Sequence, residues 1–204
     1  MYRLNNLSNA LTQNAIVSDE SDMLILVDAD DQEVGSSTKE QCHDGEGILH
    51  RAFSVFMFNA QGELLLQQRS QEKRLWPLYW SNSCCSHPRF GETIEQAALK
   101  RAREELGVSS DNLQYLYKFH YQASFGTKGS EHELCSVYIG NSSDVVMANV
   151  NEVANWRYLS AFDVSQEIDE APETFTPWFK MEWQHLIQNY SDELAAIGVD
   201  VVTS

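Results

Sequence analysis

Hydrophobic residues alternate with polar ones in some segments of this chain and recur at every third or fourth position in others, which predicts both strands and helices. Strands are predicted within 23–35, as a hairpin that turns at Asp30 and Asp31, and over 51–58, 63–68, 114–124, 133–139 and 153–159. Helices are predicted over 93–107, 160–168 and 175–190. Residues 38–49 favour a short helix or irregular structure, and 69–90 a long loop, which in a compact domain is usually functional.

This order of elements predicts an α/β (α+β) fold in which helices pack against one mixed β-sheet. A length of 204 residues fits one domain, and we find no repeat, low-complexity stretch or convincing linker. We therefore expect a single domain over 23–190. A polar, mobile extension would precede it over 1–22, and a weakly patterned tail would follow over 191–204.

The predicted helix over 93–107 carries charged residues on its apolar side. Thr93 begins it with capping-box spacing, and Gly107 stands where a helix usually ends. Arg101 and Glu105 fall within the arc of apolar residues that would face the core. Because a buried ion needs a partner, two readings follow. Either the two residues satisfy each other, or Arg101 faces an anion and Glu105 a cation in a shared site.

Composition narrows the class of protein. With 43% hydrophobic residues, no apolar run near the ~18 residues of a membrane span and no secretory signal, the chain is expected to be cytoplasmic. The net charge of −16 argues against binding to nucleic acid or to anionic membranes. Residues 39–128 nevertheless carry 11 of the 14 Lys and Arg residues. This is either ordinary surface variation or the place where a small anionic ligand binds.

The cysteines are predicted to be reduced thiols, since nothing indicates a secreted protein; they are Cys42, Cys84, Cys85 and Cys135. One hypothesis is a structural zinc site that combines thiols with nearby imidazoles, from Cys42, His43, Cys84, Cys85 and His87. It lacks the C-x2-C pairs that characterise such sites.

Residues 86–108 resemble the Nudix box, whose pattern is G-x5-E-x7-R-E-U-x-E-E-x-G-U. The matching residues are Glu92, Ala102, Glu104, Glu105, Gly107 and Val108. Three positions depart from the pattern: Ser86 replaces the first Gly, Lys100 replaces Arg, and Arg101 replaces the following Glu. The resemblance implies a Nudix-type sheet and a diphosphate ligand. The loss of an acidic residue at position 101 speaks against a Nudix pyrophosphohydrolase.

The segment NSCCSHP over 82–88 resembles the N-S-x-C-x-H-P loop of type 1 isopentenyl-diphosphate isomerases, and the resemblance extends over 23–180. Further matches are the spacing of two histidines, an E-x-E pair, a tyrosine and a Thr-Pro-Trp segment, which involve His43, His50, Glu131, Glu133, Tyr121 and Trp178. The resemblance implies that Cys85 and Glu133 transfer protons, that Tyr121 orients Glu133, and that the Trp178 ring faces a carbocation. Without the resemblance, core packing would be the ordinary role of Trp178.

The histidines and glutamates of these segments also make chemical sense as a metal site, although each histidine taken alone would more often be a hydrogen-bonded surface or core residue. Alternation along a strand puts Glu131 and Glu133 on one face. Together with the imidazoles of His43, His50 and His87 they form a nitrogen and oxygen set that suits Mn²⁺, Zn²⁺ or Fe²⁺. We predict that this set binds a first divalent metal, Mn²⁺ or Zn²⁺. The resemblance implies that Glu105 and the backbone carbonyl of Cys85 bind Mg²⁺ together with the substrate.

Basic residues are predicted to hold a diphosphate. Arg69, Lys73 and Arg74 follow a strand end at spacings that allow them to converge, although a solvated basic loop would show the same spacing. Lys39 and Arg101 match the remaining basic contacts of the isomerase family. The expected function is the interconversion of isopentenyl and dimethylallyl diphosphate by a monomer or homodimer. The alternatives are a Nudix pyrophosphohydrolase and a non-catalytic metal-binding module.

Overall fold

The structure is a computed structural model and describes residues 14–201. Predictions that concern 1–13 and 202–204 therefore lie outside the described residues. The strands are β1 (Met23–Val27), β2 (Glu33–Thr38), β3 (His50–Phe58), β4 (Leu64–Arg69), β5 (Trp80–Ser81), β6 (Cys84–Ser86), β7 (Gln114–Ser124), β8 (Ser130–Asn141) and β9 (Val153–Leu159). The helices are α2 (Lys39–His43), α3 (Ile94–Leu106), α4 (Ala161–Glu170), the short η1 (Pro172–Thr174), α5 (Pro177–Asn189) and α6 (Ser191–Ala196).

Every predicted strand and helix is present, with ends shifted by a few residues. The prediction of one long loop over 69–90 is wrong, because this segment contains β5 and β6. Strands of two or three residues are too short to show a periodicity. The tail after residue 190 forms α6, and Leu194 and Val199 from this segment are buried in the core.

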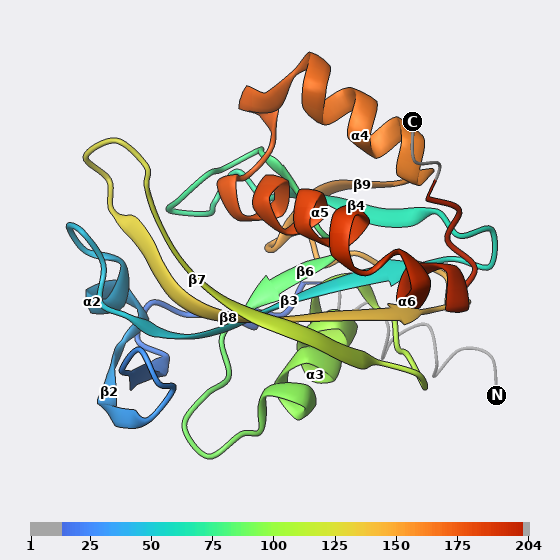
Figure 1. Cartoon of the computed structure of the whole chain (residues 1–204). Helices are drawn as coiled ribbons and strands as arrows, with labels where there is room; N and C mark the ends of the chain where they lie inside the picture. Colours follow the sequence, from blue (N-terminus) through green and yellow to red (C-terminus); the bar gives the residue numbers. More distant parts are fainter. Residues whose placement is uncertain (1–13, 202–204) are drawn as a thin grey trace, which may run out of the picture.

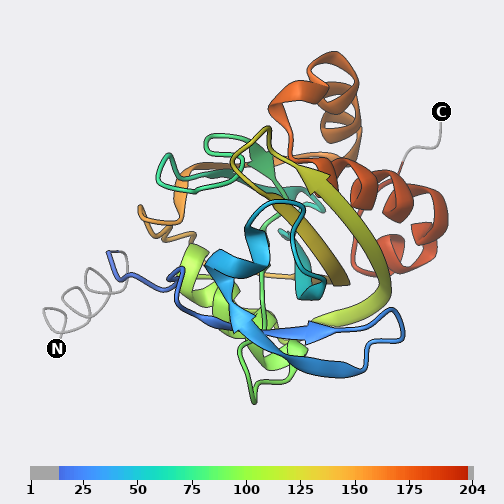
Figure 2. The same ribbon diagram turned by 90° about the vertical axis from the view of Figure 1, so that its left-hand side faces the viewer.

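The described residues form one mixed sheet of nine strands, which confirms the predicted fold class. β3 is its centre: it runs parallel to β8 along its whole length and antiparallel to β1, β4 and β6 over shorter stretches. β7 and β8 form a long antiparallel hairpin, and β9 pairs with β4. In the two views, α4, α5 and α6 cover one side of the sheet and α3 the other (Figures 1 and 2).

The core lies on both sides of β3, which explains why this strand is apolar on both faces. Phe56 and Phe58 pack in the cluster that includes Trp183 of α5, whereas Phe53 and Val55 pack in the cluster that includes residues of α3. Since a strand directs successive side chains to opposite faces, neighbouring residues of β3 serve the two clusters in turn.

The helix α3 begins and ends as its sequence predicts. The Thr93 side chain accepts a hydrogen bond from the Gln96 amide, and Gly107 adopts the left-handed conformation with φ of 73°. Such a residue ends a helix at low cost only if it is glycine. These two caps fix the register of Arg101 and Glu105 within the helix.

The segment 14–22 lies against the domain, although it was predicted as part of a mobile extension. The backbone carbonyl of Val17 accepts hydrogen bonds from Arg89 and Arg101, and that of Ala15 accepts one from Asn149. The sequence pattern could not reveal these contacts because the segment uses backbone atoms as acceptors.

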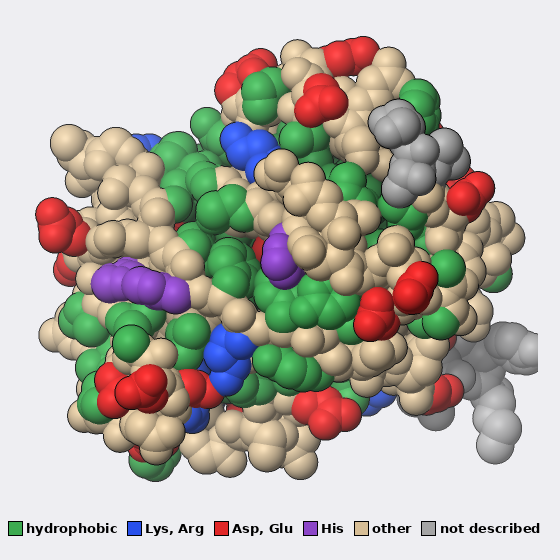
Figure 3. All heavy atoms as spheres, in the orientation of Figure 1, with side chains coloured by type: hydrophobic (Ala, Val, Ile, Leu, Met, Phe, Trp, Pro, Cys, Tyr) green, Lys and Arg blue, Asp and Glu red, His purple; other side chains and the backbone are tan. Residues whose placement is uncertain are grey.

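The surface is acidic, in keeping with the net charge. Asp and Glu side chains are spread over the face in Figure 3, and among the described residues visible there Lys and Arg form no continuous patch. Within residues 14–201, no helix combines the length and apolar composition that crossing a bilayer requires.

Candidate active site

A cavity of about 380 Å³ opens between the N-terminal segment, the loop after β4, and the strands β6 and β8. Twelve of the predicted site residues line it: Lys39, His43, Arg69, Lys73, Arg74, Cys85, His87, Arg101, Tyr121, Glu131, Glu133 and Trp178. The other two, His50 and Glu105, are buried and contact residues of the cavity wall. The fold therefore gathers residues that are far apart in sequence around one space.

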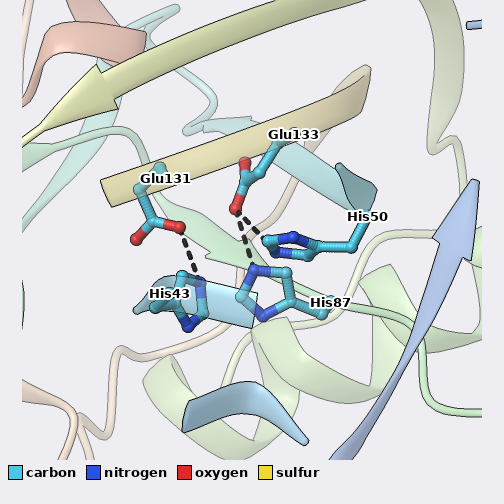
Figure 4. Close-up of side chains that lie close together, drawn as sticks. All are labelled: His43, His50, His87, Glu131 and Glu133. Atoms are coloured by element: carbon cyan, nitrogen blue, oxygen red, sulfur yellow. Dashed lines mark hydrogen bonds and ion pairs between the residues drawn. The ribbon is translucent and has the colours of Figure 1, made fainter. Parts of the chain in front are cut away.

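The predicted metal ligands come from four separate elements. His43 ends α2, His50 begins β3, His87 follows β6, and Glu131 and Glu133 lie on β8. The parallel pairing of β3 with β8 sets His50 directly beside Glu133. The five side chains point toward one another in Figure 4, and one potential ligand atom from each lies within 4.8 Å of all the others. No cysteine belongs to this group, so the zinc site with thiol ligands is not formed.

The distances within the cluster are short. His43 Nε2 lies 2.7 Å from Glu131 Oε2, and His87 Nε2 lies 2.8 Å from Glu133 Oε1. His50 Nε2 is 3.8 Å from Glu133 Oε1. The His43–Glu131 contact lacks hydrogen-bond geometry, so these two atoms and His50 Nε2 are buried without a hydrogen-bond partner. Buried polar atoms without partners are costly, and a cation bound between them would satisfy all three.

The pKa values of the clustered histidine and glutamate side chains also favour a bound cation. Burial lowers the pKa of His50 to about 4 and holds that of His87 well below its usual range, with the neighbouring histidines adding to the effect. Burial raises the pKa of Glu133, and the nearby Glu131 raises it further. For Glu131 the effect of burial is outweighed by His43, which lowers the pKa of this carboxyl. Neutral imidazoles with free lone pairs beside carboxylates are the donor set of a divalent transition metal.

Pairing of β6 with β3 decides which cysteine faces the cavity. Cys85 lies opposite Ser54, with 3.0 Å between its Sγ and the Ser54 Oγ, and its Sγ lies 2.9 Å from Asn82 Oδ1. Cys84 points to the other face and is fully buried in the cluster against α3. The four cysteines are all free, as predicted. Ser86 does not adopt a positive φ, so serine in place of glycine causes no backbone strain there.

Cys85 has an environment that favours the thiol over the thiolate. Burial raises the pKa of Cys85 well above its usual range, and the carboxyl of Glu182 raises it further. On the β8 side, the Tyr121 hydroxyl donates a hydrogen bond of 2.6 Å to Glu133 Oε2. Both groups that the sequence assigned to proton transfer thus have polar partners and line one cavity.

Aromatic rings form part of the cavity wall. The Trp178 indole nitrogen donates to Ser81 Oγ at 3.1 Å, which fixes the orientation of the ring. Its ring meets that of Trp76 edge-on, with centroids 5.2 Å apart. The guanidinium carbon of Arg69 lies 5.2 Å from the centroid of the Trp178 ring. One face of this indole is therefore already in contact with a cation.

The five basic residues that were predicted to bind a diphosphate all line the cavity, and some of them are paired with acidic side chains. Lys73 forms an ion pair with the buried Glu152, which also lies 3.5 Å from Arg101. Lys39 lies 3.3 Å from Glu20 of the N-terminal segment. Neither carboxylate was identified from the sequence, because acidic residues in polar segments carry no pattern that distinguishes them from surface charge.

Arg101 and Glu105 pair with each other, with 2.7 Å between Arg101 Nη2 and Glu105 Oε1. This is the simpler of the two readings of the charged residues on α3. Gln67 Nε2 donates to the second oxygen of Glu105 at 3.4 Å. Arg101 nevertheless lines the cavity. Its guanidinium can therefore face an anion in the cavity while it stays paired with Glu105 on the other side.

Glu182 was missed, although the sequence held a signal for it. It lies on the buried side of α5 between Phe179 and Trp183, in the apolar arc of that helix. The same criterion drew attention to Arg101 and Glu105 on α3. A carboxyl in the apolar arc of a helix, like an arginine there, indicates a buried charged group that needs a partner.

The chain is similar in sequence to known proteins. A family model described as NUDIX domain matches residues 48–179. An isopentenyl-diphosphate Delta-isomerase 1 of Photorhabdus laumondii is 44% identical over 172 residues, which make up 84% of this chain and 98% of that protein. The isopentenyl-diphosphate Delta-isomerase of Serratia proteamaculans is 43% identical and covers 87% of this chain and 98% of its own. That of an Escherichia coli strain is 35% identical, over 80% of this chain and 90% of its own.

Solved structures share the architecture. DR0079 from Deinococcus radiodurans superimposes with a TM-score of 0.59 at 27% identity, over 72% of this chain and 89% of that one. A MutT protein from Methanosarcina mazei, 14% identical, gives a TM-score of 0.57 over 70% of this chain and 95% of its own, which shows a shared fold alone. The matched domain, the identity over nearly the whole length of the relatives and the common sheet thus establish that the chain belongs to the Nudix superfamily, within the isopentenyl-diphosphate Delta-isomerase family.

Proposed function

We propose that this protein interconverts isopentenyl diphosphate and dimethylallyl diphosphate by adding a proton and removing another. One observation carries the proposal: the Cys85 thiol and the Glu133 carboxyl line the same cavity as five basic side chains. The basic side chains suit a diphosphate, and the two proton-transfer groups suit the hydrocarbon end of the same molecule.

The chemistry demands such an arrangement. Protonation of the terminal methylene carbon gives a tertiary carbocation, and loss of a proton from the adjacent CH₂ gives the allylic isomer. Because an alkene is a weak base, the acid must be well placed and water must be excluded. Cys85 and Glu133 divide the two proton transfers between them, and the Tyr121 hydroxyl, hydrogen-bonded to Glu133, orients that carboxyl.

Trp178 would stabilise the positive charge. A cation over an indole face gains about 2 kcal/mol when water is absent. The position of Arg69 supports the role, since its guanidinium carbon lies 5.2 Å from the centroid of this ring, so that the buried indole is already next to a cation. The hydrogen bond from the indole to Ser81 would keep the ring in place during the reaction.

The cluster of three histidines and two glutamates suits one cation, and a second would bind together with the substrate. His43, His50, His87, Glu131 and Glu133 would hold Mn²⁺ or Zn²⁺, and Glu105 with the Cys85 carbonyl would hold Mg²⁺ when substrate is present. The first cation would supply charge that fixes and neutralises the carboxylates, and Mg²⁺ would neutralise the diphosphate. Lys39, Arg69, Lys73, Arg74 and Arg101 would bind the diphosphate oxygens. Four free cysteines support a reducing compartment, and we propose the cytoplasm.

The test is incubation of the protein with isopentenyl diphosphate and Mg²⁺ in D₂O, with the products followed by NMR. We expect dimethylallyl diphosphate that contains deuterium; release of phosphate without isomer would indicate a hydrolase instead. Cys85→Ala should abolish turnover, whereas Cys84→Ala, which changes the neighbouring thiol on the opposite face, should keep most of it. Full activity of Cys85→Ala would refute the assignment.

A further inference from the structure

Two histidines outside the candidate active site face each other on the outer surface of the β7–β8 hairpin. His120 lies on β7 and His132 on β8, and their Nε2 atoms are 2.9 Å apart. Alternation along β8 directs Glu131 and Glu133 into the cavity and His132, which stands between them, to the opposite face. In Figure 3, histidine side chains lie next to each other in the region of this hairpin. The pair is therefore separate from the metal cluster in the cavity.

The pairing of the two strands brings these rings together. His132 lies directly opposite Gln122, and His120 precedes Gln122 by two residues, so all three side chains project from the same face of the hairpin. Diagonal neighbours on paired strands are within reach of each other when their side chains are long. Because the ladder fixes the backbone of both strands, the two imidazoles stay neighbours.

The ring of His132 is held in one orientation. Its Nδ1 lies 3.2 Å from the carbonyl oxygen of Gly47, and since a carbonyl only accepts, Nδ1 carries the proton. In the neutral ring, Nε2 then presents its lone pair to His120. A hydrogen bond at one ring nitrogen that leaves the other free is the arrangement of metal-binding histidines. Glycine at position 47 permits this approach, because a Cβ there would lie 3.0 Å from the Cβ of His132.

The distance between the two nitrogens suits a shared metal ion. Two metal–nitrogen bonds of about 2.0–2.1 Å place neighbouring ligand atoms about 2.9–3.4 Å apart, for geometries from right-angled to tetrahedral. The observed 2.9 Å lies at the lower end of this range, so a small turn of the exposed His120 ring directs both lone pairs to one ion. The hydrogen bond that the pair forms without a metal is exposed and competes with water, so it opposes this change only weakly.

We propose that His120 and His132 bind one divalent transition-metal ion through their Nε2 atoms, with water in its remaining positions. Imidazole nitrogen suits Cu²⁺, Ni²⁺ and Zn²⁺, and the affinity of a given site rises from Ni²⁺ to Cu²⁺. The net charge of −16 raises the concentration of cations near the surface. The bound ion would link β7 to β8 and should therefore stabilise the hairpin. This outer site is independent of the proposed isomerase reaction.

The test is calorimetric titration with Ni²⁺ of the full-length protein, loaded beforehand with one equivalent of Zn²⁺. The Zn²⁺ fills the cluster in the cavity, which offers five ligands. Ni²⁺ is the probe because Cu²⁺ oxidises thiols, and the protein contains four free cysteines. The wild type should bind one Ni²⁺ at the outer site. His120→Ala should weaken this binding by at least about tenfold, since loss of a metal ligand costs no less than loss of a group that orients one.

His185→Ala is the matched control, because it removes another exposed histidine, on α5, and should bind Ni²⁺ as the wild type does. Ni²⁺ should also raise the Tm of the wild type more than that of His120→Ala. Exchange of Ni²⁺ for Zn²⁺ at the cluster would be common to all three proteins and cancels in the comparison. Wild-type affinity in His120→Ala, equal weakening in His185→Ala, or a wild type that takes up no Ni²⁺ at the outer site would each refute the proposal.

Discussion

The burial of Glu182 predicts how stability changes with pH. The pKa of this carboxyl rises from an ordinary value of 4.5 to about 8 in the folded protein. A group whose pKa is raised by folding stabilises the protein below its unfolded pKa, and this contribution is lost as pH rises through the folded pKa. Each pKa unit corresponds to about 1.4 kcal/mol, so the wild type should lose about 4 kcal/mol from this group between pH 5 and pH 8.

Glu182→Gln removes this dependence, because an amide of the same size does not ionise. Urea unfolding of both proteins at several pH values between 5 and 8 gives the difference in their free energies of unfolding. Other titrating groups are common to both proteins and cancel in the difference. We expect the two to differ by no more than about 1 kcal/mol at pH 5, the size of one hydrogen bond, and the variant to be more stable at pH 8.

Glu173→Gln serves as the control, since it removes a carboxylate from an exposed position near the same helix. Its stability relative to the wild type should not change with pH. A difference between Glu182→Gln and wild type that stays constant over the whole range would show that Glu182 is already ionised in the folded protein at pH 5. The reasoning from burial would then be wrong.

Three further predictions concern the fold and the cavity. Gly129→Ala would place a Cβ against the His43 carbonyl oxygen at a positive φ of 142°. The free energy of unfolding should then fall by more than about 2 kcal/mol in a denaturation experiment, and the protein should bind less metal. The control Gly126→Ala, whose Cβ would lie in open space at a φ of 57°, should lower the free energy of unfolding by about 1 kcal/mol. Chelation should lower the Tm, as loss of a cation from the cluster predicts, and Mn²⁺ should restore it; an unchanged Tm would contradict a metal site. Lys73→Met should raise KM roughly tenfold or more in steady-state assays, whereas Lys180→Met, outside the cavity, should not.

The sequence was sufficient for every element that is long enough to show a period. The strand β3 and the helix α3 follow from local patterns, and the caps of α3 follow from Thr93 and Gly107. The sequence also predicted the residue types of the candidate site, and twelve of those residues line one cavity, whereas Glu20 and Glu152 of the same cavity were not identified. Both the secondary structure of a segment and the chemical groups it carries can be recognised from residues that are close together in the sequence.

Only the tertiary structure decided which of these residues meet. The parallel register of β3 and β8 sets His50 beside Glu133, and the pairing of β6 with β3 turns Cys85 toward the cavity and Cys84 away from it. The contact of Lys73 with Glu152 likewise joins distant segments. Such pairings depend on how the whole sheet buries its two faces, and a short strand such as β6 gains its conformation only from its neighbours. The sequence therefore determined the chemical groups of this protein, whereas long-range packing determined their distances.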